Sequence, residues 1–99
     1  MKTEEKKQKF IIRTDKAGVY FGEIEDINGS KATLRNCRML YYWNGAATVM
    51  QLAVDGVAYP KDCKFTVLVD RMMVDGVISC IPCTEKAIES INNVKVWSL

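Results

Sequence analysis

The alternation of hydrophobic and polar residues predicts that the chain begins with short β-strands. Residues 10–13 form one strand-like run, and a turn over residues 14–18 separates it from a second run over residues 19–27. The second run is rich in β-branched and aromatic residues, which favour strands. Gly22 interrupts this run, and a glycine inside a strand pattern indicates a β-bulge. We therefore expect a bent second strand.

A β-hairpin is predicted next, because Asn28-Gly29 lies between two strand-like runs. An Asn-Gly pair in this position favours the tight turn of a two-residue hairpin loop. The second arm of the hairpin extends from residue 31 to residue 43, and we expect it to bend at Arg35-Asn36.

Two short helices are predicted from their capping residues. Thr48 precedes a helical pattern with Gln51 three residues later, as in a capping box, and Gly56 is placed to end this helix. A second helix is predicted to begin after Thr84 and to end at Asn92-Asn93.

The remaining hydrophobic runs predict strands over residues 64–70, 72–81 and 94–97, with a turn over residues 59–62. Pro82 ends the second of these strands, because proline cannot donate to a strand ladder. Five to six short strands, one inserted short helix and one helix near the C-terminus predict an α+β fold. We expect a small, strongly bent, mostly antiparallel β-barrel of the SH3-like kind.

Length and charge place the chain among small single-domain proteins. The 99 residues suit one domain, and we expect a flexible charged tail over residues 1–9 and a single barrel-like domain over residues 10–99. A net charge of +2 is too small to indicate nucleic-acid binding by itself. No run approaches the ~20 apolar residues of a membrane span, and the N-terminus does not resemble a secretory signal, so we expect a cytoplasmic protein.

The types of side chain present argue against catalysis. The chain has no histidine, which removes the commonest general base and metal ligand. Its four cysteines, Cys37, Cys63, Cys80 and Cys83, include one CxxC pair, a spacing found in zinc and redox sites. Because the other two cysteines lie singly, we expect thiols buried in the core. We predict a protein without enzyme activity, cofactor or bound metal.

The segment from Arg38 to Thr48 is the strongest candidate for a binding site. It places three consecutive aromatic residues before a loop of small residues that leads into the first predicted helix. Backbone N–H groups at a helix start attract phosphate, and an exposed ring can stack on a base. The predicted ligand-binding residues are Arg38, Tyr41, Tyr42, Trp43, Asn44, Gly45, Ala46, Ala47, Thr48 and Arg13, with Lys16 as a further candidate.

Two other interpretations of this segment remain open. Its aromatic side chains are also compatible with core packing, in which case the small residues let the helix pack closely. Two aromatic residues and an arginine can equally anchor an interface with another protein.

Short motifs spread over most of the chain occur together in a recognisable combination. They are Ile12-Arg13-Thr14, Ala17-Gly18-Val19, Phe21-Gly22, Tyr42-Trp43, Gly45-Ala46-Ala47, Gln51-Leu52-Ala53, Cys63-Lys64-Phe65, the run from Ile81 to Ala87, and Val96-Trp97. In this combination the chain resembles a family of small, functionally unassigned proteins encoded by tailed bacteriophages. The resemblance implies a phage protein that acts in the cytoplasm of an infected bacterium.

The candidate site and the resemblance together predict a non-catalytic binding protein that counters host defence. We expect a homo-oligomer that sequesters a nucleotide-type immune second messenger of the bacterial host. The alternative is a protein-interaction module that inhibits or redirects a host protein. A second alternative, a small-barrel nucleic-acid binder, fits the low net charge less well.

Overall fold

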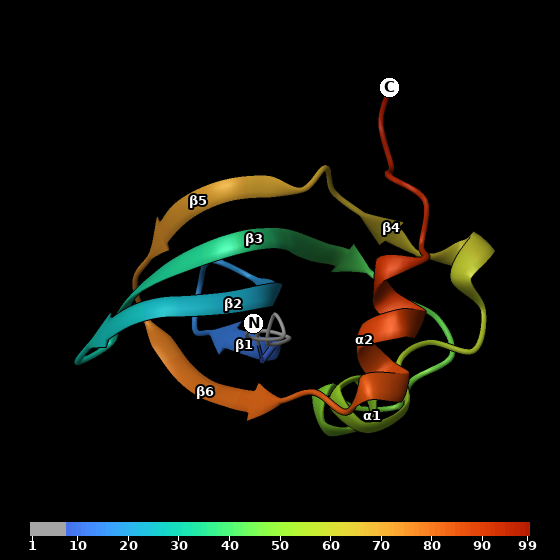
Figure 1. Ribbon diagram of the computed structural model, residues 1–99. Helices are drawn as coiled ribbons and strands as arrows, with labels where there is room; N and C mark the ends of the chain where they lie inside the picture. Colours follow the sequence, from blue (N-terminus) through green and yellow to red (C-terminus); the bar gives the residue numbers. More distant parts are fainter. Residues whose placement is uncertain (1–7) are drawn as a thin grey trace, which may run out of the picture.

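The computed structural model describes residues 8–99 and shows a curved sheet with two short helices beside one end of it (Figure 1). The elements, in chain order, are β1 (Phe10–Thr14), β2 (Val19–Asn28), β3 (Lys31–Tyr42), α1 (Val49–Asp55), a 3₁₀ turn (Pro60–Asp62), β4 (Lys64–Phe65), β5 (Val69–Val74), β6 (Val77–Pro82) and α2 (Glu85–Asn92). Most of the predicted tail, residues 1–7, lies outside the described residues. Gln8 and Lys9 belong to the folded part, because both bond to the backbone of Cys83.

The sheet is antiparallel, with strand order β4-β3-β2-β1-β6. β3 pairs with both β4 and β5. The N-terminal part of β3 pairs with β5, and the C-terminal end of β3 pairs with β4. Within residues 8–99, β5 and β6 do not pair with each other, so the sheet is not closed. The structure thus confirms an α+β fold with a mostly antiparallel six-stranded sheet, but it does not confirm the predicted barrel.

The prediction of one strand over residues 72–81 is wrong, because the chain turns at Asp75-Gly76 and leads from β5 to β6. The Asp75 carboxylate accepts hydrogen bonds from the Ser30 hydroxyl at 2.9 Å and from the Gly76 amide at 2.7 Å. The Val77 amide also donates to Ser30 O at 2.9 Å. These bonds hold the turn against the β2–β3 hairpin.

Two other predicted strands are shorter than expected. The predicted strand over residues 64–70 is interrupted at residues 66–68, which separate β4 from β5. The predicted C-terminal strand is reduced to a single parallel bridge between Phe65 and Val96. β4 therefore has β3 on one side and the C-terminal segment on the other.

A β-bulge produces the predicted bend at Arg35-Asn36. The β2–β3 register shifts there, so that Asn36 and Cys37 together face Gly22, and Asn36 has a φ of 50°. A Cβ atom on Gly22 would lie 2.5 Å from the Cβ of Cys37. Gly22 is therefore needed because β3 bulges against it. The extra residue at this position is in β3, and β2 has a bulge of its own at Glu25, between the pairs Ile24–Leu34 and Asp26–Thr33.

Both predicted helices are confirmed with their caps. Thr48 accepts a hydrogen bond from the Gln51 amide, Gly56 ends α1 with a φ of 77°, and Thr84 accepts from the Ala87 amide. The Thr84 hydroxyl also donates to a carbonyl oxygen of α1 at 2.6 Å. This bond links the start of α2 to the end of α1.

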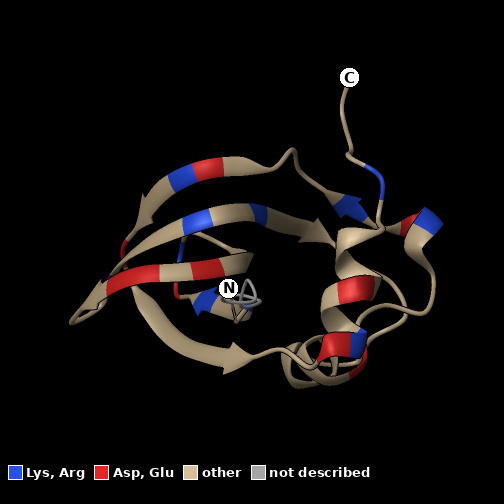
Figure 2. Ribbon diagram, viewed as in Figure 1, with Lys and Arg blue, Asp and Glu red and all other residues tan. Residues whose placement is uncertain are grey.

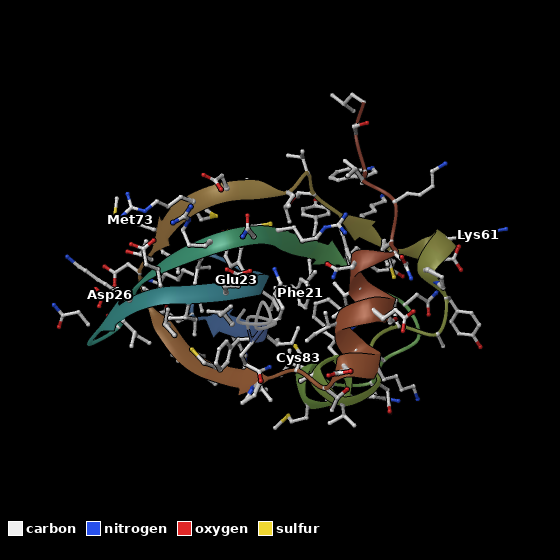
Figure 3. All side chains as sticks on the ribbon, in the orientation of Figure 1. Phe21, Glu23, Asp26, Lys61, Met73 and Cys83 are labelled. Atoms are coloured by element: carbon white, nitrogen blue, oxygen red, sulfur yellow. The ribbon has the colours of Figure 1, made fainter. Side chains whose placement is uncertain are left out.

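The hydrophobic core has two parts. The first lies between the sheet and the helices, where Phe21 and Cys83 are seen beside α2 (Figure 3). The second consists of strand residues alone, among them Ile12, Tyr20 and Leu34. The helices therefore cover one end of the curved sheet, and the sheet covers its own interior at the other end.

Replacement of Gly22 tests the close contact between β2 and β3. We expect Gly22→Ala to lower the free energy of unfolding by about 3 kcal/mol, because the added methyl group overlaps the backbone of β3. Gly29→Ala is the matched control. It meets no atom within 4 Å and should cost about 1 kcal/mol through its left-handed backbone alone. Urea denaturation measures both, and equal losses would contradict this account of Gly22.

Candidate binding site

Arg38 is buried, in contrast to the phosphate contact predicted for it. Only 5% of the residue is exposed, and its guanidinium donates four hydrogen bonds to backbone carbonyl oxygens. Nε donates to Thr66 at 3.0 Å, Nη1 to Ile91 and Val94 at 3.2 and 3.1 Å, and Nη2 to Phe65 at 3.3 Å. Burial lowers the pKa of Arg38. The guanidinium thus joins the end of α2 to β4, and it is not available to a ligand.

The loop that follows β3 uses its backbone amides within the protein. The Asn44 amide donates to the Cys63 sulfur at 3.4 Å, and the Ala47 amide donates to the Gln51 side chain at 2.8 Å. α1 itself has only seven residues. These contacts do not support the predicted phosphate site at the start of this helix.

The small residues of this loop allow close packing. Gly45 has a φ of 96°, and a Cβ atom on it would lie 2.5 Å from the Ala58 amide nitrogen. Ala46 packs against the first part of the core. Thr48 is occupied as the cap of α1. Close packing therefore explains the small residues Gly45 and Ala46, whereas Ala47 and Thr48 are exposed and bond to Gln51 at the start of α1.

Tyr41 and Tyr42 are both exposed, at 61% and 50%, although they are neighbours on one strand. Strict alternation would place one of them on the buried face. The β3–β4 register explains the difference, because Leu40 pairs with Phe65 and Tyr42 pairs with Lys64, which leaves Tyr41 as an extra residue. This bulge near the end of β3 turns both tyrosines outward.

Tyr41 stacks on Trp97 from the C-terminal segment. The two ring centroids are 5.1 Å apart and the planes differ by 13°. Lys64 Nζ lies 5.4 Å from the centre of the Trp97 ring, a cation–π distance. The Trp97 amide donates to Phe65 O at 2.9 Å, and the same oxygen accepts from Arg38. Arg38 and the Trp97 backbone are therefore connected through one carbonyl oxygen.

A shallow pocket lies between Tyr41 and the β1–β2 turn. It is lined by Lys16, Ala17, Gly18, Val19, Met39, Leu40, Tyr41 and Trp43. Gly18 permits this arrangement, because its φ is 105° and a Cβ atom there would lie 3.0 Å from the Met39 methyl group. Arg13 pairs with Val19 in the β1–β2 ladder, so the two side chains share one face.

The pocket thus brings together some of the predicted site residues and omits others. Tyr41 and Trp43 line it, Arg13 is next to it, and the exposed Lys16 side chain supplies a positive charge. Arg38 and residues 44–48 have structural contacts instead. Trp97 and Lys64 were not predicted, and nothing local in the sequence indicates that they approach Tyr41.

The cysteines pack in the core, as expected. Cys37, Cys63 and Cys83 are buried and Cys80 is half-buried, and all four are free thiols. Burial raises the pKa of each, that of Cys83 to about 12. Cys80 packs against the second part of the core and Cys83 in the first. Within residues 8–99, no three Cys, Asp or Glu side chains are grouped so that they could hold a metal ion.

Comparison with known proteins gives one finding about family. The model of a domain of unknown function, DUF6948, matches residues 7–91. The chain belongs to the DUF6948 family. The match fits the functionally unassigned family that the motifs predicted, and it includes all six strands but not Trp97. Neither the curated proteins nor the solved structures contain a match to this DUF6948 chain. Among residues 8–99, no helix has the length and apolar character needed to span a membrane.

Replacement of Arg38 tests its role as a buried connector. Arg38→Met removes the four hydrogen bonds that the guanidinium donates to backbone carbonyl oxygens, so we expect the free energy of unfolding to fall by at least about 3 kcal/mol. The near-ultraviolet circular dichroism of the Tyr41–Trp97 pair should also weaken. Arg71→Met is the control, because Arg71 forms an exposed ion pair with Glu25 and its loss should leave stability near that of the parent protein. Similar stabilities for the two variants would refute the connector role.

Stability should fall at alkaline pH because the Cys83 thiol keeps its proton in the folded state. Its pKa rises from 9.0 to about 12 on folding, so the unfolded state alone loses the proton between these values. The contribution of this thiol to the free energy of unfolding is fully present below pH 9.0 and is lost as the pH rises toward 12. Cys83→Ala should flatten the decline of unfolding free energy over this range. An unchanged slope in urea denaturation would show that the thiol does not contribute.

Proposed function

We propose that this DUF6948 protein is a non-catalytic binding protein that holds a flat, anionic, nucleotide-type ligand in the pocket beside Tyr41. The observation that carries the proposal is the juxtaposition of two aromatic side chains, Tyr41 and Trp43, with the Lys16 side chain in one open pocket. A flat ring beside a cation fits a base that is joined to a phosphate.

The geometry supports stacking as the main source of affinity. Tyr41 is held by its contact with Trp97, so one aromatic wall of the pocket is already oriented before a ligand arrives. Stacking of a base on an aromatic side chain contributes about 1–3 kcal/mol and tolerates different bases. An oriented ring loses little conformational freedom on binding, which favours affinity.

Positive charge at the mouth of the pocket supports a phosphate. Lys16 and Arg13 are both exposed; Lys16 lines the pocket, and Arg13 pairs with Val19, which lines it as well. The lining, all of it within the described residues, offers rings, aliphatic groups and an ammonium group, but no carboxylate or thiol. Such a lining suits retention of a ligand rather than its chemical conversion.

The resemblance to phage proteins suggests a role for such a binder. A phage protein that binds nucleotides in the bacterial cytoplasm can sequester the second messengers that activate host immunity. We propose this anti-defence role for the pocket. The open shape of the pocket suits a ligand that lies across the surface, as a dinucleotide does.

Titration with nucleotides tests the proposal. We expect a cyclic dinucleotide or an ADP-ribose derivative to release heat in calorimetry and to quench tryptophan fluorescence. Lys16→Gln should weaken binding by about tenfold, which is the value of one charged hydrogen bond, while Lys31→Gln on the distant hairpin should not. If every member of the panel gives no heat, the nucleotide proposal fails. Binding of single-stranded oligonucleotides that weakens steeply with salt would favour the nucleic-acid alternative.

A further inference from the structure

Exposed positive charge without an ion pair gathers around the stacked rings of Tyr41 and Trp97. Among residues 8–99, six exposed cations have no carboxylate partner. Five of them lie in the segments around the stack: Arg13, Lys16, Lys61, Lys64 and Lys95. The sixth, Lys31, is at the start of β3, on the β2–β3 hairpin. The cations around the stack are therefore available to an anion from solution.

These cations lie on both sides of the stack. Tyr41 is near the end of β3, which lies between β2 and β4 in the sheet. On the β2 side, Lys16 lines the pocket together with Tyr41, and Arg13 is next to the pocket. On the β4 side, Lys64 Nζ lies 5.4 Å from the centre of the Trp97 ring, and neither residue lines the pocket. Because β3 separates them, the backbones of β2 and β4 are about 10 Å apart.

Lys64 and Lys95 lie side by side on the β4 side of the stack. The bridge between Phe65 and Val96 is parallel, so the residues that precede them in the two segments are neighbours. Like charges on neighbouring strands destabilise each other. An anion bound between the two ammonium groups removes this repulsion, which favours a phosphate at this position.

The surroundings of Lys64 and Lys95 are basic and include an exposed ring. Lys61 adds a third positive charge, and Asp62 is the one acidic side chain in the 3₁₀ turn, β4 and the C-terminal segment. Figure 2 shows this distribution, with blue on the turn, on β4 and on the C-terminal segment. Tyr42 is 50% exposed and pairs with Lys64. This side of the stack therefore repeats the combination of ring and cation that the pocket offers.

We infer that the ligand has two nucleotides joined through phosphate and lies across the stack. One phosphate contacts Lys16, and the other lies between Lys64 and Lys95. The stacked rings separate the two basic groups, so one phosphate cannot contact both. One base stacks on Tyr41, and the second lies against Tyr42. This inference rests on the proposed function of the pocket and names the class of its ligand.

Two sources supply this chemistry, a cyclic dinucleotide and a short stretch of single-stranded nucleic acid. Both present two bases and two phosphates, and stacking on an aromatic side chain tolerates different bases. A strand extends beyond the two phosphate sites, so its binding should weaken more steeply with salt than that of a cyclic dinucleotide. The ligands of the test distinguish the two sources.

Calorimetric titration of the full chain tests the second phosphate site. The ligands are 5′-mononucleotides, cyclic dinucleotides and 5′-phosphorylated RNA strands of four nucleotides, each with adenine and with guanine. We expect cyclic dinucleotides or strands to bind at least about tenfold tighter than mononucleotides, because a second charged hydrogen bond is added. Lys95→Gln and Lys64→Gln should each weaken binding of these larger ligands about tenfold and leave mononucleotide binding unchanged. Lys31→Gln, which removes an exposed and unpaired lysine on the hairpin, is the matched control and should change neither.

The outcomes separate this inference from the proposed function. Tighter binding of cyclic dinucleotides identifies a messenger as the ligand, and tighter binding of the strands identifies single-stranded nucleic acid. Mononucleotides that bind as tightly as the larger ligands would overturn the inference and leave the pocket proposal standing. Larger ligands that bind the Lys95→Gln variant as tightly as the parent protein would do the same. If none of the ligands binds, the proposed function itself fails, and the inference fails with it.

Discussion

The buried guanidinium of Arg38 is the interaction on which the arrangement of this protein depends. It supplies donors to carbonyl oxygens of β4, of the residue that follows β4, of the last turn of α2 and of the segment after α2. These carbonyl groups lie at or just beyond the ends of β4 and α2, where regular hydrogen bonding stops. One cation therefore supplies hydrogen bonds at the ends of two elements. The exposed aromatic surface is built on this connection, since the Trp97 backbone bonds to Phe65, one of the residues that Arg38 holds.

Extra residues in the strands give the sheet its curvature and its surface chemistry. The bulge at Asn36 is accommodated by Gly22 on the neighbouring strand, and the one at Tyr41 turns two consecutive tyrosines toward solvent. The same kind of irregularity thus serves two purposes. Near the middle of β3 it bends the sheet around a core, and at the end of β3 it creates an aromatic surface.

Turn and capping residues were sufficient to predict those elements whose ends depend on neighbouring residues in the chain. The Asn28-Gly29 hairpin, the Thr48 and Thr84 caps and the Gly56 helix end are all confirmed. The turn at Asp75-Gly76 carried an equally local signal, but the continuous hydrophobic run around it concealed that signal. The strand break at residues 66–68 has no local signal, because it depends on bonds to β3.

The candidate site was predictable only in part, because it too depends on contacts between distant parts of the chain. Tyr41 and Trp43 reach a common pocket with Lys16, but the register that exposes Tyr41 depends on its pairing with β4. Arg38 was assigned to the solvent because its charge suggested a ligand, whereas its partners are carbonyl oxygens far along the chain. The contact of Trp97 with Tyr41 joins positions more than half the chain apart, and no periodicity or spacing could reveal it.

The pairing of β1 with β6 determines when the sheet can be completed. Ile11 pairs with Ile81, so one edge of the sheet is missing until β6 has been synthesised. Contacts between such distant positions form only after a long loop has closed, and closing it costs conformational entropy. This slows folding relative to helical domains of similar size. Until then the outer edge of β1 presents unpaired backbone groups that can associate with other chains. The nascent protein is therefore most vulnerable to aggregation in the interval before its final strand reaches the first.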